Sequence, residues 1–327
     1  MKVLFFGINY HTYTRDLIHE MTLLGAQVTF VDIQPRSLAL KTFRTISGAL
    51  YNAYVQKYLL NAVERLRSTL FDKVIFLQVH QMEMGVLSEL RRSQSQAEFT
   101  LYNWDAISTH DYLEHTELFD RVLTFDRSDA TVHNFGYLPL FCSRQFQEMP
   151  RDKELLNSAY MVGNIVRLER YHAVEAFREY CIREGILFQH HLKISPVVLS
   201  HAVYANIWPR NVSARSISPN AFISMMETSA AAFDFANHSQ SGQTMRMMES
   251  ICAGKKVITN NARVKEEPIY SPDRIHVFTG LDFSGVSEFL QTPISDPDER
   301  FRQFHIQAFT RYFLGLERVA TFGGRSV

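Results

Sequence analysis

The chain has few cysteines and no long hydrophobic run, and each shortage excludes a class of protein. Three cysteines, Cys142, Cys181 and Cys252, occur among 327 residues. They are far apart, odd in number and outside any CxxC or Cys/His metal spacing, which argues against a disulfide framework and a zinc site. We expect them to be buried thiols of a reducing compartment. No apolar run approaches the roughly 18 residues of a membrane span, and the N-terminal run is too short for a signal peptide. The sequence therefore favours a cytoplasmic protein.

An excess of charge of either sign is also missing. The chain has 34 Lys and Arg against 34 Asp and Glu. No overall field attracts the protein to nucleic acid, so we expect no nucleic-acid partner. Hydrophobic residues, by contrast, make up 46% of the chain, which is enough for two substantial cores. We predict two domains.

The first half reads as a doubly wound α/β domain. Residues 2–7 form an apolar strand ending in glycine, residues 15–24 an amphipathic helix stopped by Gly25, and residues 27–32 a second strand. Further strands are predicted at residues 73–77, 99–103, 121–125 and 137–140. The polar residues that follow these strands should share one edge of a parallel sheet. They are His80, Gln81, Asp105, Asp126 and Arg127.

The second half repeats the same pattern. A strand at residues 159–162 is followed by Gly163, Asn164 and a helix that stops at Gly185. Further strands are predicted at residues 186–189, 231–234, 256–259 and 276–278. We therefore predict two Rossmann-like domains facing a central cleft, residues 1–148 and 158–296. Regularly spaced phenylalanines in residues 297–327 predict a C-terminal helix that packs back on the core.

The stretch from residue 234 to 261 reads strand, loop, helix, strand. Its helix is opened by Gly242 and closed by Gly254. In an open parallel sheet, ligands bind beyond the carboxyl ends of the strands, where a helix N-terminus offers free amides and a positive dipole end. The stretch is typical of the phosphate side of a nucleotide site.

Three patches of the sequence resemble one family. The first is Leu101-Tyr-Asn-Trp104-Asp105-Ala106, and the second runs through residues 118–127 to Leu138-Pro-Leu-Phe141. The third patch is spread over the stretch from residue 234 to 261 and comprises Asp234, Gln240, Gly242, Thr244, Arg246, Glu249, Lys255, Lys256, Thr259 and Asn260. Together they resemble the GT-B-type bacterial glycosyltransferases of lipopolysaccharide and capsule biosynthesis, the CgeB-like group. Gln243 departs from this pattern at a position that is usually apolar, and Ala106 stands where serine is common.

The resemblance implies a transferase that moves a sugar from a nucleotide-sugar donor to a hydroxyl of a glycan or lipid-linked acceptor. It implies no cofactor and no bound metal, because cationic side chains and a helix dipole balance the diphosphate charge. Two rivals remain open: a nucleotide-sugar epimerase or hydrolase of the same fold, and a catalytically silent module that binds sugars or partners.

The donor residues are expected in the second domain. Amides and hydroxyls of Gln240, Gly242, Gln243 and Thr244 are candidates for the diphosphate, with Arg246 and Glu249 following on the same helix. Glu249 is a candidate acceptor for ribose hydroxyls, although an ordinary i,i+3 ion pair between Arg246 and Glu249 is the alternative. A second group, Gly163, Arg167 and Arg170, offers cations to the leaving diphosphate, with a solvated helix face as the alternative.

The catalytic base is expected in the first domain. Asp105, next to Trp104, is the first candidate, and His11 and His80 also follow strand ends. Asp105 can instead cap a following helix, and thirteen histidines make chance placement of His11 and His80 common.

Residues 35–70 are rich in basic and aromatic side chains, with Glu64 as the only acid. They predict a peripheral contact with the inner face of the cell membrane, where lipid-linked acceptors lie. An ordinary solvated helix pair is the alternative.

Overall fold

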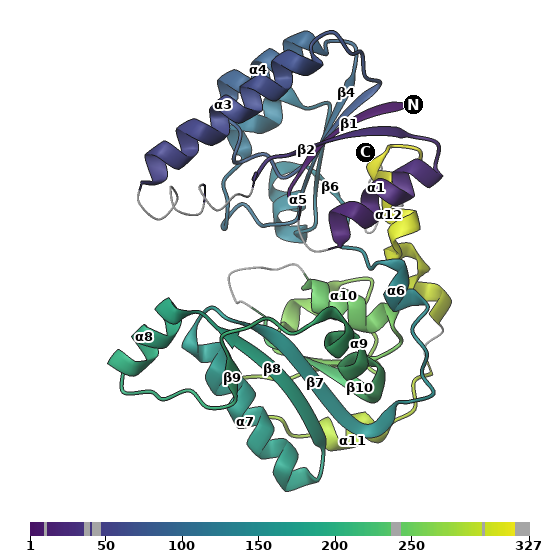
Figure 1. Ribbon diagram of the computed structural model, residues 1–327. Coiled ribbons are helices and arrows are strands. Elements are labelled where there is room, and N and C mark those ends of the chain that lie inside the picture. The colour runs from purple at the N-terminus through teal and green to yellow at the C-terminus, as the bar shows by residue number, and fades with distance from the viewer. Residues whose placement is uncertain (10–11, 36–39, 41–46, 237–242, 296–297, 318–327) are drawn as a thin grey trace. The chain divides into compact units, whose positions relative to one another are not determined.

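The computed structural model describes residues 1–9, 12–35, 40, 47–236, 243–295 and 298–317, which are coloured in Figure 1. The chain divides into two compact units. Unit 1 holds the described residues of 1–140 and those from 306 onward, and unit 2 holds those of 141–238 and 243–305. Within the described ranges, each unit contains a six-stranded parallel sheet, so the predicted pair of doubly wound α/β domains is confirmed. No helix in these ranges is long and apolar enough to cross a membrane.

The sheet of unit 1 has the strand order β2-β1-β3-β4-β5-β6. Its strands are β1 (Lys2–Gly7), β2 (Gln27–Asp32), β3 (Lys73–Leu77), β4 (Glu98–Asn103), β5 (Arg121–Thr124) and β6 (Gly136–Tyr137). All of them pair in parallel, so the residues after β3, β4 and β5 share one edge as predicted. The strand predicted over residues 137–140 is largely wrong, because only Tyr137 lies in β6. Pro139 has no backbone N–H, so it cannot donate to the ladder.

Helices cover both faces of this sheet (Figure 1). They are α1 (Tyr13–Leu23), α3 (Gly48–Leu66), α4 (Met84–Ser93), α5 (Arg127–His133) and α12 (Ile306–Phe313), with the 3-10 helix η1 (Leu113–Leu118). Alternate strand residues point to opposite faces. Leu4 and Phe6 of β1 therefore join the core under α3 and α4, while Phe5 of β1 contacts Phe313 of α12.

Unit 2 has the strand order β12-β11-β10-β7-β8-β9. Its strands are β7 (Leu155–Ile165), β8 (Leu187–Ile194), β9 (Val212–Ser213), β10 (Ser229–Asp234), β11 (Lys256–Thr259) and β12 (Ile275–Val277). Strand β7 extends well beyond the predicted residues 159–162. Gly163 and Asn164 are not in a turn but inside β7, where they pair with Leu192 and Lys193 of β8. The short edge strand β9 had no counterpart in the sequence prediction.

Helices again lie on both faces of the unit 2 sheet. They are α6 (Arg144–Gln147), α7 (Leu168–Glu184), α8 (Pro196–Tyr204), α9 (Pro219–Thr228), α10 (Met245–Cys252) and α11 (Val286–Gln291), with the 3-10 helices η2 (Ala262–Glu266) and η3 (Asp298–Phe304). The aromatic core under α7 is built around Phe177 and Phe233, whose rings stack at 4.1 Å. On the other face, Tyr160 of β7 contacts Ser250 of α10 and Phe222 of α9. This packing fixes α10 against the end of the central strands.

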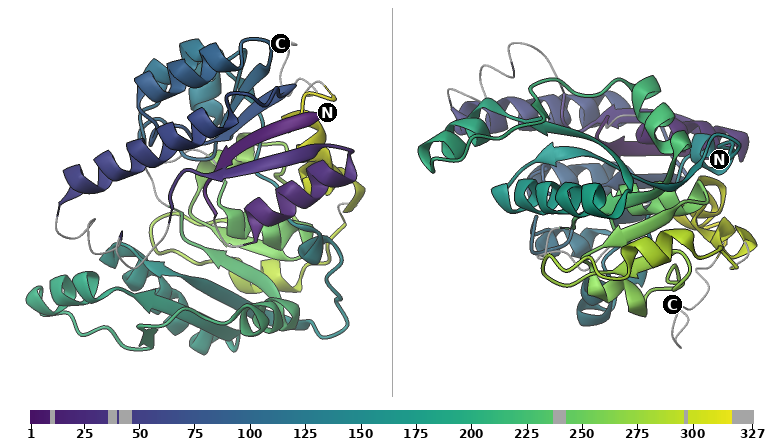
Figure 2. Two further views of the ribbon diagram at one scale, coloured as in Figure 1. Left: turned by 45° about the horizontal axis from the view of Figure 1, so that its top comes forward. Right: turned by 90° about the horizontal axis from the view of Figure 1, so that it is seen from below.

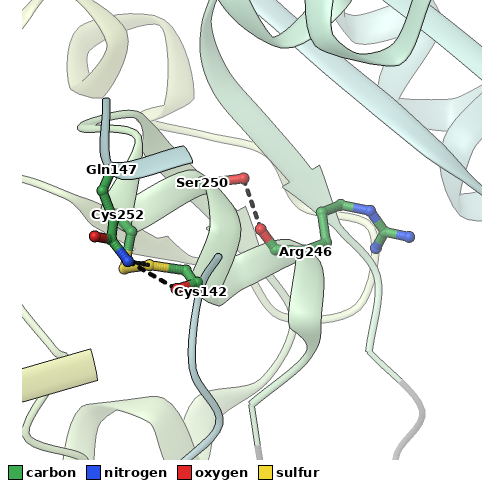
Figure 3. Close-up of a disulfide and its surroundings, with 5 residues drawn as sticks. All are labelled: Cys142, Gln147, Arg246, Ser250 and Cys252. Atoms are coloured by element: carbon green, nitrogen blue, oxygen red, sulfur yellow. Dashed lines mark hydrogen bonds between the residues drawn. A yellow bond between two sulfur atoms is a disulfide. The ribbon is translucent and has the colours of Figure 1, made fainter. Parts of the chain in front are cut away.

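The expectation of three thiols is wrong for two of the cysteines. Cys142 and Cys252 form a disulfide that joins the start of unit 2 to the last residue of α10 (Figure 3). The Gln147 side-chain amide donates to the Cys142 carbonyl oxygen at 2.9 Å. No pattern in the sequence predicted this pair, because the two residues are 110 positions apart. Cys181 is a buried free thiol as expected, and burial raises its pKa to about 12.

Candidate functional site

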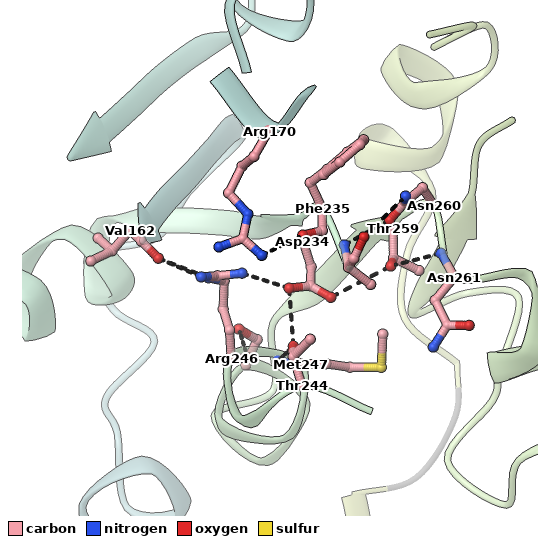
Figure 4. A network of polar contacts seen from close by, with 12 residues as sticks. Val162, Arg170, Asp234, Phe235, Thr244, Arg246, Met247, Thr259, Asn260 and Asn261 are labelled. Carbon is pink, nitrogen blue, oxygen red and sulfur yellow. Dashed lines mark hydrogen bonds and ion pairs between the residues drawn. The ribbon is translucent and has the colours of Figure 1, made fainter. Parts of the chain in front are cut away.

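A buried carboxylate organises the carboxyl ends of the central strands of unit 2 (Figure 4). Asp234 is the last residue of β10 and is fully buried. Arg246, in the first turn of α10, places its Nη1 2.6 Å from Asp234 Oδ1. The same guanidinium donates through Nε and Nη2 to the Val162 carbonyl oxygen of β7, at 3.0 and 2.6 Å. One ion pair therefore ties together β10, β7 and α10.

Two threonines complete the partners of this carboxylate. Thr244 is the N-cap of α10, because its Oγ1 accepts from the Met247 amide at 3.1 Å. Its hydroxyl proton is donated to Asp234 Oδ1 at 3.0 Å. Thr259, at the end of β11, donates to Asp234 Oδ2 at 3.5 Å. A buried charge needs such partners, since an uncompensated carboxylate inside a protein is costly.

Gly163 leaves the space that Arg246 occupies. A Cβ added at this position would lie 2.9 Å from Arg246 Nη2 and 3.1 Å from Met161 Cε. Any side chain here would displace either the guanidinium or the methionine. Gly163 is thus placed beside the predicted donor residues, and the absence of a side chain is what allows Arg246 to reach β7.

The two predicted arginines of α7 differ in how their side chains are engaged. Arg170 donates to the Asn164 and Phe235 carbonyl oxygens at 2.8 and 3.3 Å. Burial, and then the nearby charge of Arg246, lower the pKa of Arg170. Arg167 occupies the N-cap position of α7 and is exposed, and its side chain has no hydrogen bond or ion pair with any described residue. The start of this 17-residue helix therefore carries two cations: the exposed Arg167, which has no partner among the described residues, and the half-buried Arg170.

The topology places this cluster where α/β sheets bind ligands. The central pair of the unit 2 sheet is β7 and β10, and the chain builds outward from that pair in opposite directions. Such a reversal is a topological switch point, and ligands bind beyond the carboxyl ends of the strands there. Val162 and Gly163 near the end of β7 and Asp234 at the end of β10 lie at this point. The strand order matches that of dinucleotide-binding domains.

The remaining donor candidates have different outcomes. Gln240 and Gly242 lie outside the described residues. Gln243 is buried, which explains why an apolar residue suits that position, and its Oε1 has no hydrogen-bond partner within the described chain. Glu249 is also buried, on α10. Its predicted contact with a ribose stays a prediction.

Two lysines of the third patch have structural contacts. The Lys255 ammonium is fully buried, 2.7 Å from Glu154 Oε2. Lys256 donates to the carbonyl oxygens of Phe289, Leu290 and Thr292 at the end of α11. Basic side chains at a helix C-terminus satisfy its free carbonyls. Neither lysine is therefore available to a ligand in this structure.

A second polar cluster lies at the carboxyl ends of β3 and β4 in unit 1. The Gln78 side-chain amide donates to Asp105 Oδ2, and the rings of His80 and His110 stack at 4.0 Å. Asp105 is followed by turn residues rather than by a helix, so the helix-capping alternative is wrong. Gln78 was missed by the sequence analysis. It directly follows β3 with φ of 70°, a conformation that is strained for a residue with a side chain and is enriched at functional sites.

The surroundings shift the pKa values of both candidate bases. Burial raises the pKa of Asp105, although His110 and the hydrogen bond from Gln78 act in the opposite direction. Burial, with His110 and His115 nearby, lowers the pKa of His80 to about 4. At neutral pH the His80 ring is therefore uncharged, and the low pKa makes it a weak proton acceptor. His11 lies outside the described residues.

The metal-ligating side chains of the described residues do not show whether the protein binds a metal. In the described ranges, Cys142, Cys252 and His305 bring metal-ligating atoms within 4.8 Å of one another, but both sulfurs belong to the disulfide. The sequence also contains one Asp-x-Asp pair, Asp296 and Asp298, of which Asp296 lies outside the described residues. Transfer without a metal stays a prediction.

No family model matches the chain, and no curated protein matches it. Among solved structures, it is similar to the apo form of the lipopolysaccharide outer core galactosyltransferase WaaB, with 14% identity and a TM-score of 0.58 over 97% of this chain and 99% of that one. An alpha-glucosyltransferase in complex with UDP and a 13-mer DNA has 11% identity and a TM-score of 0.60, over 96% and 95% of the two chains. A protein provisionally named UDP-N-acetylglucosamine 2-epimerase, from Listeria monocytogenes, has 8% identity and a TM-score of 0.55, over 96% and 94%. At these identities the similarity shows a shared fold, that of GT-B glycosyltransferases.

Proposed function

We propose that this chain is a nucleotide-sugar-dependent glycosyltransferase that moves a sugar to a hydroxyl of a glycan or lipid-linked acceptor. The observation that carries this proposal is the ionic cluster of Asp234, Arg246 and Arg170 at the switch point of a Rossmann-order sheet. Galactosyl and glucosyl transferases with the same fold, one of them bound to UDP, support it. A role in bacterial lipopolysaccharide or capsule assembly rests on the sequence resemblance and on the WaaB neighbour.

On the donor side, unit 2 supplies fixed positive charge. Arg246 is held by Asp234 and by the end of β7, and it lies close enough to Arg170 to affect its pKa. Arg170 and the exposed Arg167 then offer guanidinium donors to a diphosphate at the start of α7. Arg170 and Arg246 are held by the protein, and such preorganised cations stabilise a leaving nucleoside diphosphate with little reorganisation as charge develops.

On the acceptor side, unit 1 supplies the base. Asp105, or the neutral His80, takes the proton of the acceptor hydroxyl. The acceptor oxygen forms a bond to the anomeric carbon, the bond from that carbon to the phosphate oxygen breaks, and its electron pair leaves on the nucleoside diphosphate. The hydrogen bond from Gln78 orients the Asp105 carboxylate for this step.

Ligand-induced stabilisation tests the donor site. In a thermal-shift panel of nucleoside mono- and diphosphates and nucleotide sugars, a ligand at 100 times its Kd stabilises the wild type by about 2.7 kcal/mol. Arg167→Ala and Arg170→Ala should each weaken that response. Arg178→Ala, on the same helix but paired with Glu175, is the matched control. A panel without any stabilising nucleotide would contradict the donor assignment, and unchanged binding in Glu249→Ala would contradict the ribose contact.

Turnover tests the base. Asp105→Asn should abolish transfer and leave the donor-induced thermal shift intact, with His80→Gln as the parallel variant for the second candidate. Retained turnover in either variant removes that residue as the base. Comparing turnover of the two variants therefore distinguishes Asp105 from His80 as the base.

The epimerase or hydrolase alternative has one specific observation in its favour, the structural similarity to the Listeria monocytogenes protein. Release of nucleoside diphosphate at the same rate with and without every acceptor tried would favour it. A catalytically silent binding module would bind a nucleotide or a sugar without any turnover. The departure at Gln243 motivates this second alternative.

Cytoplasmic location, the membrane contact and the absence of a nucleic-acid partner stay predictions. Cytoplasmic location with a membrane contact through residues 35–70 rests on the sequence. In α3, Tyr51 and Tyr58 of this segment pack against the unit 1 core, which leaves Tyr54 as its exposed aromatic residue in the described part. The absence of a nucleic-acid partner is also untested, and one neighbour of the same fold was solved with DNA.

A further inference from the structure

A long basic segment of unit 2 contains no acidic residue. No Asp or Glu occurs between Glu184 and Glu227. Lys193, Arg210 and Arg215 lie in this interval. None of these three cations forms an ion pair with a described residue. The segment therefore carries uncompensated positive charge although the whole chain is neutral.

The same segment exposes large apolar side chains on and just after α8. Tyr204 is 96% exposed, Trp208 68% and Val197 63%. We define the α8 patch as these residues together with the two other exposed aliphatic residues of the helix: Val197, Leu199, Val203, Tyr204 and Trp208. Isolated exposed apolar residues are ordinary, but five large ones within twelve positions on and just after one short helix are a concentration of the kind that marks an interaction site.

The α8 patch is the outward side of a helix that is already anchored. Val198 packs against the unit 2 core, and Ala202 is fully buried. The segment after the helix is held by the Tyr171 hydroxyl, which accepts from the Arg210 amide at 3.0 Å, and by the His191 ring, which contacts the Arg215 carbonyl at 2.9 Å. Helix α8 lies at the edge of unit 2 in Figure 1 and in the left view of Figure 2. Because the opposite face of α8 already packs on the unit 2 core, the α8 patch cannot also be buried there.

We propose that the α8 patch is a docking surface for an anionic lipid bilayer. Tyr and Trp are the side chains that concentrate at the membrane–water interface, and the aliphatic residues of a short helix insert beside them. Lys193, Arg210 and Arg215 add electrostatic attraction to anionic headgroups. Apolar insertion and charge act together here, as two signals are needed for stable peripheral binding.

Charge argues against a second copy of the chain as the occupant. In a two-fold symmetric contact the same patch would face itself, so the cations of one copy would meet those of the other with no acid between Glu184 and Glu227 to pair them. A bilayer rich in anionic lipid has the complementary charge. The surface is also distinct from residues 35–70, because those residues belong to unit 1 and the α8 patch belongs to unit 2.

Vesicle co-sedimentation of the full chain tests the proposal. The probes are unilamellar vesicles of phosphatidylcholine alone and of phosphatidylcholine with about one third phosphatidylglycerol. We expect binding to the anionic vesicles only, weakened by raising salt from about 0.1 to 1 M, since the Debye length falls from about 10 to 3 Å. The double variants Tyr204→Ser/Trp208→Ser and Arg210→Glu/Arg215→Glu should each lower the partition coefficient by about tenfold or more.

Leu156→Ser is the matched control, because Leu156 of β7 is 76% exposed and lies outside the acid-free segment. It should bind as the wild type does, and circular dichroism should show that all variants are folded. Absence of wild-type binding, or binding that neither double variant changes, overturns the proposal. Loss in Tyr54→Ser alone would assign the contact to residues 35–70 instead. Self-association that Trp208→Ser abolishes, without vesicle binding, would make the occupant a second copy.

Discussion

At the scale of single residues, Asp234 determines how the candidate donor site is built. Its buried carboxylate holds Arg246, Thr244 and Thr259, which come from two different elements. The sequence predicted that the Thr244 hydroxyl contacts a diphosphate and that Arg246 belongs to the nucleotide-sugar site, and it gave Thr259 no ligand role. The structure shows that Arg246 and Thr244 have partners inside the protein: both contact Asp234, and Arg246 also contacts the Val162 carbonyl oxygen. Arg167 is exposed, so under the proposed function it is the candidate that can contact a ligand without losing a contact to a described residue.

Asp234→Asn should strongly destabilise unit 2. The change leaves the Arg246 guanidinium, which is only 16% exposed, without its counter-charge. Breaking a buried ion pair on one side costs about 3–5 kcal/mol. The free energy of unfolding in urea is the measurement. Glu299→Gln is the control, because its pair with Arg302 is exposed and should be worth about 1 kcal/mol or less. Equal effects of the two variants would contradict a buried pair.

Gly163→Ala should weaken donor binding without unfolding the protein. The added methyl group would lie 2.9 Å from Arg246 Nη2, so the guanidinium must shift away from Val162. We expect a loss of about tenfold in nucleotide affinity, which corresponds to about 1.4 kcal/mol. Gly85→Ala is the matched control, since a Cβ there meets nothing within 4 Å. Titration calorimetry measures the nucleotide affinity of both variants. Wild-type affinity in Gly163→Ala would show that the Arg246 guanidinium can shift without weakening nucleotide binding.

His80 should make stability depend on pH. Its pKa in the folded protein is about 4, below the ordinary 6.5, so the unfolded chain binds the proton more tightly. Stability is therefore unaffected well above pH 6.5 and falls as the pH drops toward 4. Because solvent screens this half-buried ring, we expect the loss of stability between pH 7 and pH 5 to be about 1 kcal/mol.

Urea unfolding of wild type and His80→Gln at the two pH values isolates this effect, because the other titrating groups are common to both proteins. His19→Gln, on the exposed side of α1, is the control and should keep the wild-type dependence. A His80→Gln variant with the same loss between pH 7 and pH 5 would show that other groups carry it.

At the scale of elements, the C-terminal segment closes the unit 1 core. Residues 298–304 form the 3-10 helix η3, and the α-helix begins only at Ile306. Phe309 and Phe313 of α12 contact Tyr102 of β4, and Phe313 also contacts Phe5 of β1. Helix α12 therefore covers the face of the sheet that α3 and α4 leave open, next to α1.

Phe313→Ala should destabilise unit 1 by about 3–5 kcal/mol, because it leaves a cavity between α12 and the sheet. Tyr312→Ala is the control on the same helix, since the Tyr312 side chain is only partly buried and its backbone oxygen keeps the hydrogen bond from Arg121. Thermal unfolding with a unit 1 probe, such as emission of Trp104 in a Trp208→Phe background, makes the comparison. A loss below 1 kcal/mol in Phe313→Ala would contradict a core role for α12.

At the scale of the whole chain, the Cys142–Cys252 disulfide closes a long covalent loop. It joins residues 110 positions apart within unit 2. A cross-link over a loop of this length restricts the unfolded chain and stabilises the folded one by roughly 2–5 kcal/mol.

Reduction with dithiothreitol should lower the stability of the wild type by that amount. The double variant Cys142→Ser/Cys252→Ser should be less stable from the start and should not respond to the reductant. Urea unfolding of both proteins, with and without reductant, measures the difference. A wild type that is insensitive to reductant, with two reactive thiols by mass, would show that the pair is reduced in solution.

The sequence by itself determined the fold class and the position of most strands. Alternating apolar patterns and glycine stops located β1, β2, β3 and β11 at their observed bounds, because buried strands and helix ends are set by local chemistry. It also located Asp105 and His80 after strand ends and Arg170 in the first turn of a helix. The predicted strand at β7 was too short. Gly163 and Asn164 are typical turn residues in sequence, and only their pairing with β8 shows that they belong to the strand.

Only the tertiary structure decided which side chains meet. The contacts between Asp234 and Arg246, between Gln78 and Asp105, and between Cys142 and Cys252 join residues 12, 27 and 110 positions apart, and no local spacing encodes them. The strain at Gln78 and the exposure of Tyr204 and Trp208 are likewise results of packing. Periodicity reports which face of an element is apolar, whereas partners, burial and pKa shifts depend on what the folded chain brings to that face.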